Sequence, residues 1–108
     1  MTGKNYIGNQ LVATGTKTYK TFNPELDQEN ETVFVEATSK EIEEAVNLAA
    51  SAFKEFRTIS GVKKAEFLNA IADEILVLDD LLIQTFCLES GLPEGRAKGE
   101  RGRTIGQL

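Results

Sequence analysis

The chain has 108 residues, enough for one hydrophobic core, and its 41% hydrophobic and 27% charged content is that of an ordinary globular protein. Its 12 basic and 17 acidic residues give a net charge of -5, which argues against a dedicated nucleic-acid binder, because such proteins carry an excess of basic residues. The absence of histidine removes the commonest general base and the commonest metal ligand, so any catalysis would rest on carboxylates, lysine, tyrosine or the single cysteine, Cys87.

The cysteine content and the N-terminal sequence bear on the cellular compartment. Cys87 has no second cysteine for an internal disulfide, which favours a reducing environment. No hydrophobic signal core follows the first residues, and no apolar run is long enough to span a membrane. We therefore expect a cytoplasmic protein.

The first third of the chain has the patterns of β structure. Residues 6–12 form a short strand signal around Gly8-Asn9, a two-residue turn candidate. Residues 18–22 alternate polar and aromatic side chains, and Asn23-Pro24 ends this strand because proline cannot donate to a β ladder.

An acidic segment follows at residues 27–31. It lacks the ligand spacing of an EF-hand loop, so we expect a hairpin turn there and not a calcium site. The next strand is predicted over residues 32–36.

From residue 38 the apolar spacing becomes helical. Thr38 precedes Glu41 by three residues, the spacing of a capping box, and Ser60-Gly61 interrupts the pattern and offers a second cap. Asp79-Asp80 places negative charge where the dipole of a third helix favours it, and Gly91 follows as a stop. The predicted core positions are Ile42, Ala45, Val46, Ala49, Phe53 and Phe56 in the first helix, Ala65, Leu68, Ile71, Ala72, Ile75 and Leu76 in the second, and Leu82, Phe86 and Cys87 in the third.

Four glycines near the end of the chain, Gly95, Gly99, Gly102 and Gly106, have the spacing of one helix face. Each costs about 1 kcal/mol relative to alanine, so we expect a helix there only if another element packs closely against the glycines. We expect that element to lie outside these residues. Residues 104–108 contain no cap or turn residue that would end the helix.

Several segments together resemble the aldehyde dehydrogenase family. Residues 6–12 resemble its opening strand, Ile-Gly-Gly-x-Trp, with Leu11 in place of the tryptophan. Residues 89–108 resemble the branch that oxidises 2-oxoglutarate semialdehyde (2,5-dioxopentanoate), often with NADP. The other matching segments, in the family's order, are Asn23-Pro24, Val33 to Thr38, Ile42-x-x-Ala45-Val46, Ala49-Ala50-x-Ala52-Phe53, Ala65-x-x-Leu68 and Glu89-Ser-Gly-Leu-Pro93, the last of which matches the landmark Glu-Thr-Gly-Lys-Pro.

The resemblance implies an α+β segment of a larger α/β enzyme. Strands and a hairpin would fill residues 1–37, and three to four helices would fill residues 38–108, truncated at the C-terminus. The implied function is that of a non-catalytic N-terminal part of an oxidoreductase that converts an aldehyde to a carboxylic acid with NAD or NADP. Its implied partners are the remainder of the same chain and further copies in a homo-oligomer, with no nucleic acid and no membrane.

The family's catalytic residues are not in this sequence. The resemblance places a nucleophilic cysteine, a glutamate base and an oxyanion-stabilising asparagine later in the polypeptide, and the Gly-x-Thr-x-x-Gly cofactor loop is absent here. We therefore expect this chain alone to be inactive and to bind no cofactor.

The resemblance also implies a weak cation site. Many family members bind a monovalent cation through backbone carbonyls just before Asn-Pro and through an acidic residue of the Glu-Thr-Gly region. The corresponding residues are Thr21, Phe22 and Glu89, and such oxygen ligands suit a hard cation. A further ligand would come from beyond Leu108.

Other interpretations compete with these. Cys87 as a nucleophile is disfavoured, because it lies mid-helix with no histidine to lower its pKa, so we expect a buried small hydrophobic residue. The alternative function is a self-standing α+β interaction module without enzymatic activity, whose three helices offer a groove or a dimer face. A third possible function is that of a small nucleic-acid-associated protein that binds through the basic residues near the C-terminus. It is disfavoured because acidic residues interrupt this basic tail and no aromatic residue is available there for base stacking. We expect that tail to form a solvated basic face opposite the glycines, with Arg96, Lys98, Arg101 and Arg103 as its basic residues.

Overall fold

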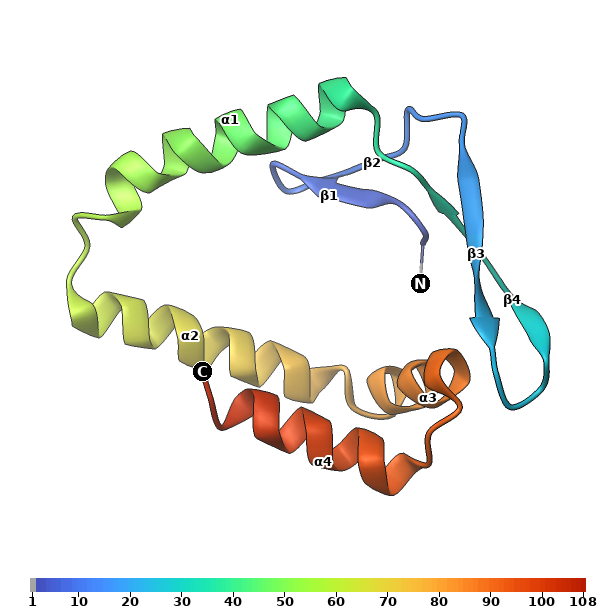
Figure 1. The fold of residues 1–108 in the computed structure, drawn as a ribbon. Coiled ribbons are helices and arrows are strands. Elements are labelled where there is room, and N and C mark those ends of the chain that lie inside the picture. Colours follow the sequence, from blue (N-terminus) through green and yellow to red (C-terminus); the bar gives the residue numbers. More distant parts are fainter. Residues whose placement is uncertain (1) are drawn as a thin grey trace. The chain divides into compact units, whose positions relative to one another are not determined.

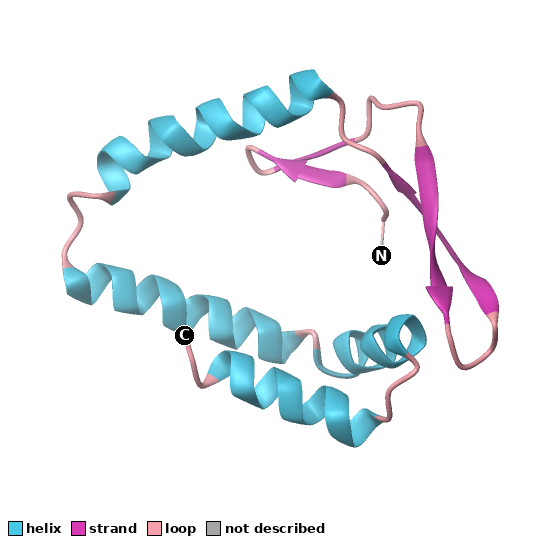
Figure 2. Ribbon diagram, viewed as in Figure 1, coloured by secondary structure: helices cyan, strands magenta, loops and turns pink. Residues whose placement is uncertain are grey.

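The computed structural model describes residues 2–108 as two β-hairpins followed by four helices (Figures 1 and 2). This arrangement confirms the predicted α+β class. Within the described residues, no helix is both long and apolar enough to cross a membrane. The elements are β1 (Asn5–Ile7), β2 (Gln10–Val12), β3 (Thr18–Asn23), β4 (Gln28–Val35), α1 (Ser39–Phe56), α2 (Gly61–Val77), α3 (Asp79–Ser90) and α4 (Glu94–Ile105).

The chain divides into two compact units. The first contains the residues up to Thr21 together with Glu31–Ile59, and the second contains Phe22–Asn30 and Ser60–Leu108. The first unit therefore holds the β1–β2 hairpin and α1, and the second holds α2, α3 and α4.

The β1–β2 hairpin of the first unit turns at Gly8-Asn9, as predicted. Both residues have positive φ, 56° and 65°, which is the requirement of a two-residue type I′ turn. Ile7 is buried, and a Cβ on Gly8 would lie only 2.8 Å from the Leu48 side chain of α1. The hairpin thus lies directly against α1. Its antiparallel register is Asn5↔Val12, Tyr6↔Leu11 and Ile7↔Gln10.

The turn between β3 and β4 is not where the acidic residues predicted it. It occupies residues 24–27, and β4 already begins at Gln28, so the expected turn at residues 27–31 and the expected strand start at residue 32 are wrong. The Oδ1 atom of Asn23 accepts the backbone N–H groups of Glu25 and Leu26, at 2.9 and 3.0 Å, and so fixes the turn directly after β3. Two of the acidic residues, Glu29 and Glu31, occupy exposed positions of β4, where a strand tolerates charge.

The first helix begins as predicted but does not have a buried apolar face. Glu41 is its only buried residue, and Phe53, a predicted core residue, is 60% exposed. Of the remaining predicted core positions, Ala45 is half-buried, and Ile42, Val46, Ala49 and Phe56 are exposed. The β1–β2 hairpin, whose strands have three residues each, is too small to cover an 18-residue helix.

The core of the second unit lies among α2, α3 and α4. Its buried apolar residues are Ala72, Ile83 and Ala97, and Ile83 is only 1% exposed. The predicted α3 core residues Leu82, Phe86 and Cys87 are half-buried, and Ile83 was not among them. The helix α3 contacts both α2 and α4. Its most buried residue, Ile83, is therefore determined by two neighbouring helices and not by a single apolar stripe along α3.

We expect Ile83→Ala to cost about 2–5 kcal/mol of unfolding free energy, because it empties space in a packed core. Phe53→Ala is the matched comparison, since it removes a larger but exposed side chain and should cost about 0.5 kcal/mol or less. Urea denaturation of the two variants measures both values. A larger loss for Phe53→Ala would contradict the observed exposure of α1.

Candidate functional site

The side chain of Glu41 accepts hydrogen bonds from two segments of the first unit. Its carboxylate accepts hydrogen bonds from the Thr38 backbone N–H at 2.7 Å, the Thr38 hydroxyl at 2.9 Å and the Thr14 backbone N–H at 3.0 Å. The Glu41 backbone N–H donates to Thr38 Oγ1 at 3.2 Å, so the predicted capping box is confirmed. The additional bond from Thr14 joins the start of α1 to the loop after β2.

These hydrogen bonds determine the chemistry available to Glu41. The backbone donors of Thr38 and Thr14 lower the pKa of the carboxyl from 4.5 to about 2, although burial opposes this shift. A carboxylate with so low a pKa is a weak base, and its oxygens already accept three hydrogen bonds. Glu41 is therefore suited to holding the backbone and not to proton transfer.

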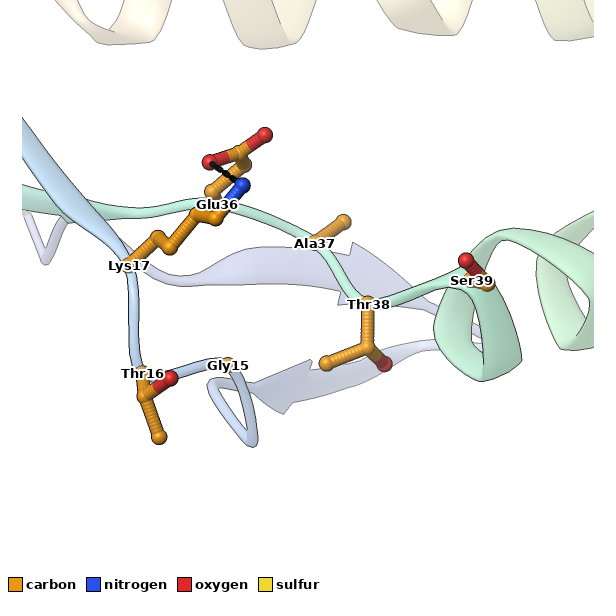
Figure 3. Close-up of a pocket in the computed structure, with 7 residues that line it drawn as sticks. All are labelled: Gly15, Thr16, Lys17, Glu36, Ala37, Thr38 and Ser39. Carbon is orange, nitrogen blue, oxygen red and sulfur yellow. Dashed lines mark ion pairs between the residues drawn. The ribbon is translucent and has the colours of Figure 1, made fainter.

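A pocket of about 280 Å³ adjoins this capping box in the first unit (Figure 3). Its only charged side chains are Lys17 and Glu36, which form an ion pair at 3.9 Å and are both largely exposed. The pocket offers hydroxyl groups, but it has neither a histidine to activate one of them nor a cysteine to act as the nucleophile. Its lining residues are Gly15, Thr16, Lys17, Glu36, Ala37, Thr38 and Ser39.

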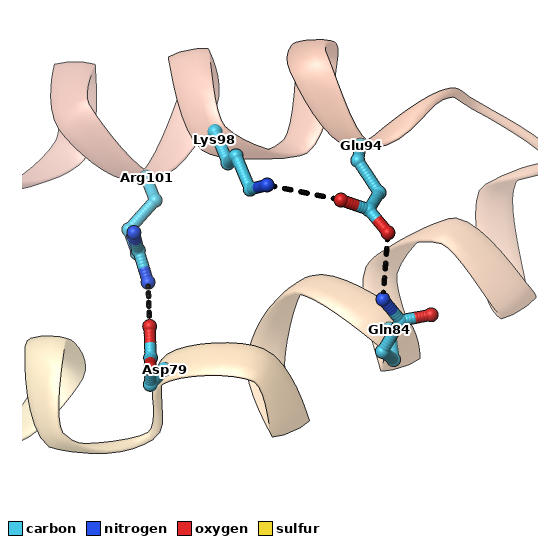
Figure 4. A network of polar contacts seen from close by, with 5 residues as sticks. All are labelled: Asp79, Gln84, Glu94, Lys98 and Arg101. Carbon is cyan, nitrogen blue, oxygen red and sulfur yellow. Dashed lines mark hydrogen bonds and ion pairs between the residues drawn. The ribbon is translucent and has the colours of Figure 1, made fainter.

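Polar contacts tie α4 to α3 in the second unit (Figure 4). Glu94 accepts hydrogen bonds from Lys98 Nζ and Gln84 Nε2, each at 2.9 Å, and Arg101 Nη1 lies 3.4 Å from Asp79 Oδ1. The bonds from Lys98 and then Gln84 lower the pKa of Glu94, and the bond to Glu94 raises the pKa of Lys98.

The four basic residues of α4 do not form the predicted basic face opposite the glycines. Besides Lys98 and Arg101, which pair with Glu94 and Asp79, Arg96 and Arg103 both pair with Glu100. An apolar groove of about 290 Å³ lies on the side of α4 away from the glycines, and α2, α3 and α4 line it. Burial of Ala97 there anchors α4, so tertiary packing and not solvation determines this face.

The glycine face of α4 is open within the described residues. A Cβ placed on Gly95, Gly99 or Gly102 would have no neighbouring atom within 4 Å beyond the helix's own backbone. The predicted helix is present, but it ends at Ile105, where the Gly106 N–H still bonds to the Gly102 carbonyl oxygen at 3.0 Å. Gly106 has the right-handed conformation, with φ -70°, so it is not a left-handed glycine stop, and the expectation that residues 104–108 lack a cap is not contradicted. That another element covers the glycine face of α4 stays a prediction.

The residues of the predicted cation site lie on two elements. Thr21 is half-buried and Phe22 is exposed, both in β3, and Glu89 is half-buried in α3. Thr21 belongs to the first unit and the other two to the second. Among residues 2–108, no three His, Cys, Asp or Glu side chains group as metal ligands, but a site built on backbone carbonyls does not depend on such a group. The cation site stays a prediction.

Two of the motifs that carry the family resemblance touch each other in the second unit. Gly91 ends α3 in the left-handed conformation, with φ 68°, as the predicted stop requires. A Cβ at this position would lie 2.8 Å from Pro24 Cγ, so the Asn23-Pro24 turn packs against the end of α3. The sequence predicted each motif separately but not their contact.

Comparisons with known proteins identify the class of protein to which this sequence belongs. The model of the family described as "Aldehyde dehydrogenase family" matches residues 11–108. The structure is also similar to a solved betaine aldehyde dehydrogenase from Staphylococcus aureus in complex with NAD+, with a TM-score of 0.81 and 20% identity over 94% of this chain and 21% of that chain. The chain therefore belongs to the aldehyde dehydrogenase family, and the resemblance noted in the sequence is confirmed.

Two curated relatives show which branch of the family is similar. Alpha-ketoglutaric semialdehyde dehydrogenase 2 of Azospirillum brasilense is 42% identical over 109 residues, which cover 100% of this chain and 21% of the relative. Alpha-ketoglutaric semialdehyde dehydrogenase of Acinetobacter baylyi is 35% identical over 98% of this chain and 20% of the relative. The chain spans about a fifth of the length of these relatives.

Glu41→Gln should destabilise the chain in a pH-dependent way. Because the folded-state pKa of Glu41 is lowered, its contribution to stability is fully present above the ordinary value of 4.5 and is lost as the pH falls towards about 2. The stability difference between the unmodified chain and Glu41→Gln should therefore be largest near neutral pH and shrink on acidification. Denaturation from pH 7 to 2 measures it, with the exposed Glu44→Gln on the same helix as the control. A difference that does not change with pH would contradict the assignment.

Gly91→Ala and Gly99→Ala should change stability in opposite directions. Gly91 has a left-handed conformation, which lowers the stability by about 1–2 kcal/mol when the residue has a side chain. The close contact between an alanine Cβ and Pro24 would lower the stability further. Gly99 lies in a helix with open space around it, so alanine should stabilise the chain by about 1 kcal/mol. Thermal unfolding followed by circular dichroism tests the pair, and two changes of the same sign would refute it.

Proposed function

We propose that this chain is the N-terminal, non-catalytic segment of an oxidoreductase that oxidises 2-oxoglutarate semialdehyde to the corresponding dicarboxylic acid with NAD or NADP. The observation that carries the proposal is the 42% identity to an alpha-ketoglutaric semialdehyde dehydrogenase over the whole of this chain, which is 21% of that relative. The proposal divides the enzyme into a scaffold formed by these residues and a reaction centre elsewhere in the polypeptide.

The local chemistry supports a scaffold role. Cys87 lies within α3, half-buried, in a chain without histidine, and Glu41 is committed to backbone hydrogen bonds. Among residues 2–108, every buried side-chain nitrogen or oxygen has a hydrogen-bond partner, so no buried side-chain polar atom is left unpaired to bind a ligand. These groups stabilise the two units and leave aldehyde oxidation to residues outside them.

Exposed apolar surface is an argument for two kinds of partner. These are the remainder of the same polypeptide and further copies in a homo-oligomer. Val46 and Phe53 of α1 and Phe67 and Val77 of α2 are each more than half exposed. Exposed large apolar side chains along two helices are typical of faces that another element covers. The open glycine face of α4 would admit the backbone of such an element at close range.

The first test of the proposed function is cofactor binding. The purified 108-residue chain should neither reduce NAD or NADP with 2-oxoglutarate semialdehyde nor bind either cofactor tightly, because it contains no phosphate-binding glycine loop. Isothermal titration calorimetry measures the binding, with the longer enzyme that contains this chain as the positive control. Micromolar binding to the 108 residues would overturn the non-catalytic assignment.

The second test concerns the partner of α4. In the 108-residue chain, Gly99→Leu should increase helix content, because nothing lies near this position and leucine is the better helix former. In the longer enzyme the same substitution should lower the thermal stability, because the leucine side chain would fill the space that a covering element uses. Arg103→Leu, on an exposed flank of α4, is the control. Unchanged stability of the Gly99→Leu enzyme would show that the face is not covered.

A further inference from the structure

We draw no further inference here: the strongest candidate, the apolar groove that Ile75, Leu82 and Ala97 line between α2, α3 and α4, carries nothing because nothing in the structure shows what covers it.

Discussion

The carboxylate of Glu41 accepts hydrogen bonds from two separate segments, the turn that begins α1 and the loop that follows β2. Burial of an anion is costly unless donors surround it, so the burial of this carboxylate relies on the hydrogen bonds from both segments. The position of α1 on the β1–β2 hairpin follows from this requirement, and Ile7 is buried where the hairpin meets the helix. Glu41 is the only side chain that α1 buries, so these hydrogen bonds are the main polar attachment of this helix to its unit.

The second unit depends on packing and not on a buried charge. The Arg96–Glu100 and Lys98–Glu94 ion pairs lie at the surface of α4, where such pairs contribute little to stability. The glycines weaken α4, so the helix relies on Ala97 and on its contact with α3. The two faces of α4 thus differ: one holds the helix to its unit, and the glycine face has no neighbouring atoms within the described residues.

Local signals in the sequence predicted the structure well, and long-range burial was not predictable. The Gly8-Asn9 turn and the Thr38 capping box depend on residues a few positions apart, and both are confirmed. The turn expected at residues 27–31 was wrong because charge is tolerated on an exposed strand face. The burial of Ile83 and the exposure of Phe53 depend on which elements lie against their helices, and spacing along one helix does not contain that information.

The contact between Pro24 and Gly91 has a consequence for folding kinetics. The two residues are separated in the sequence by three helices, so their contact closes a long loop. Chain entropy opposes loop closure, and the opposition grows only with the logarithm of loop length. A contact of this kind raises the contact order and forms after the local helices have provided its surfaces. We therefore expect the Asn23-Pro24 turn to form locally but to dock onto the end of α3 late in the folding of its unit.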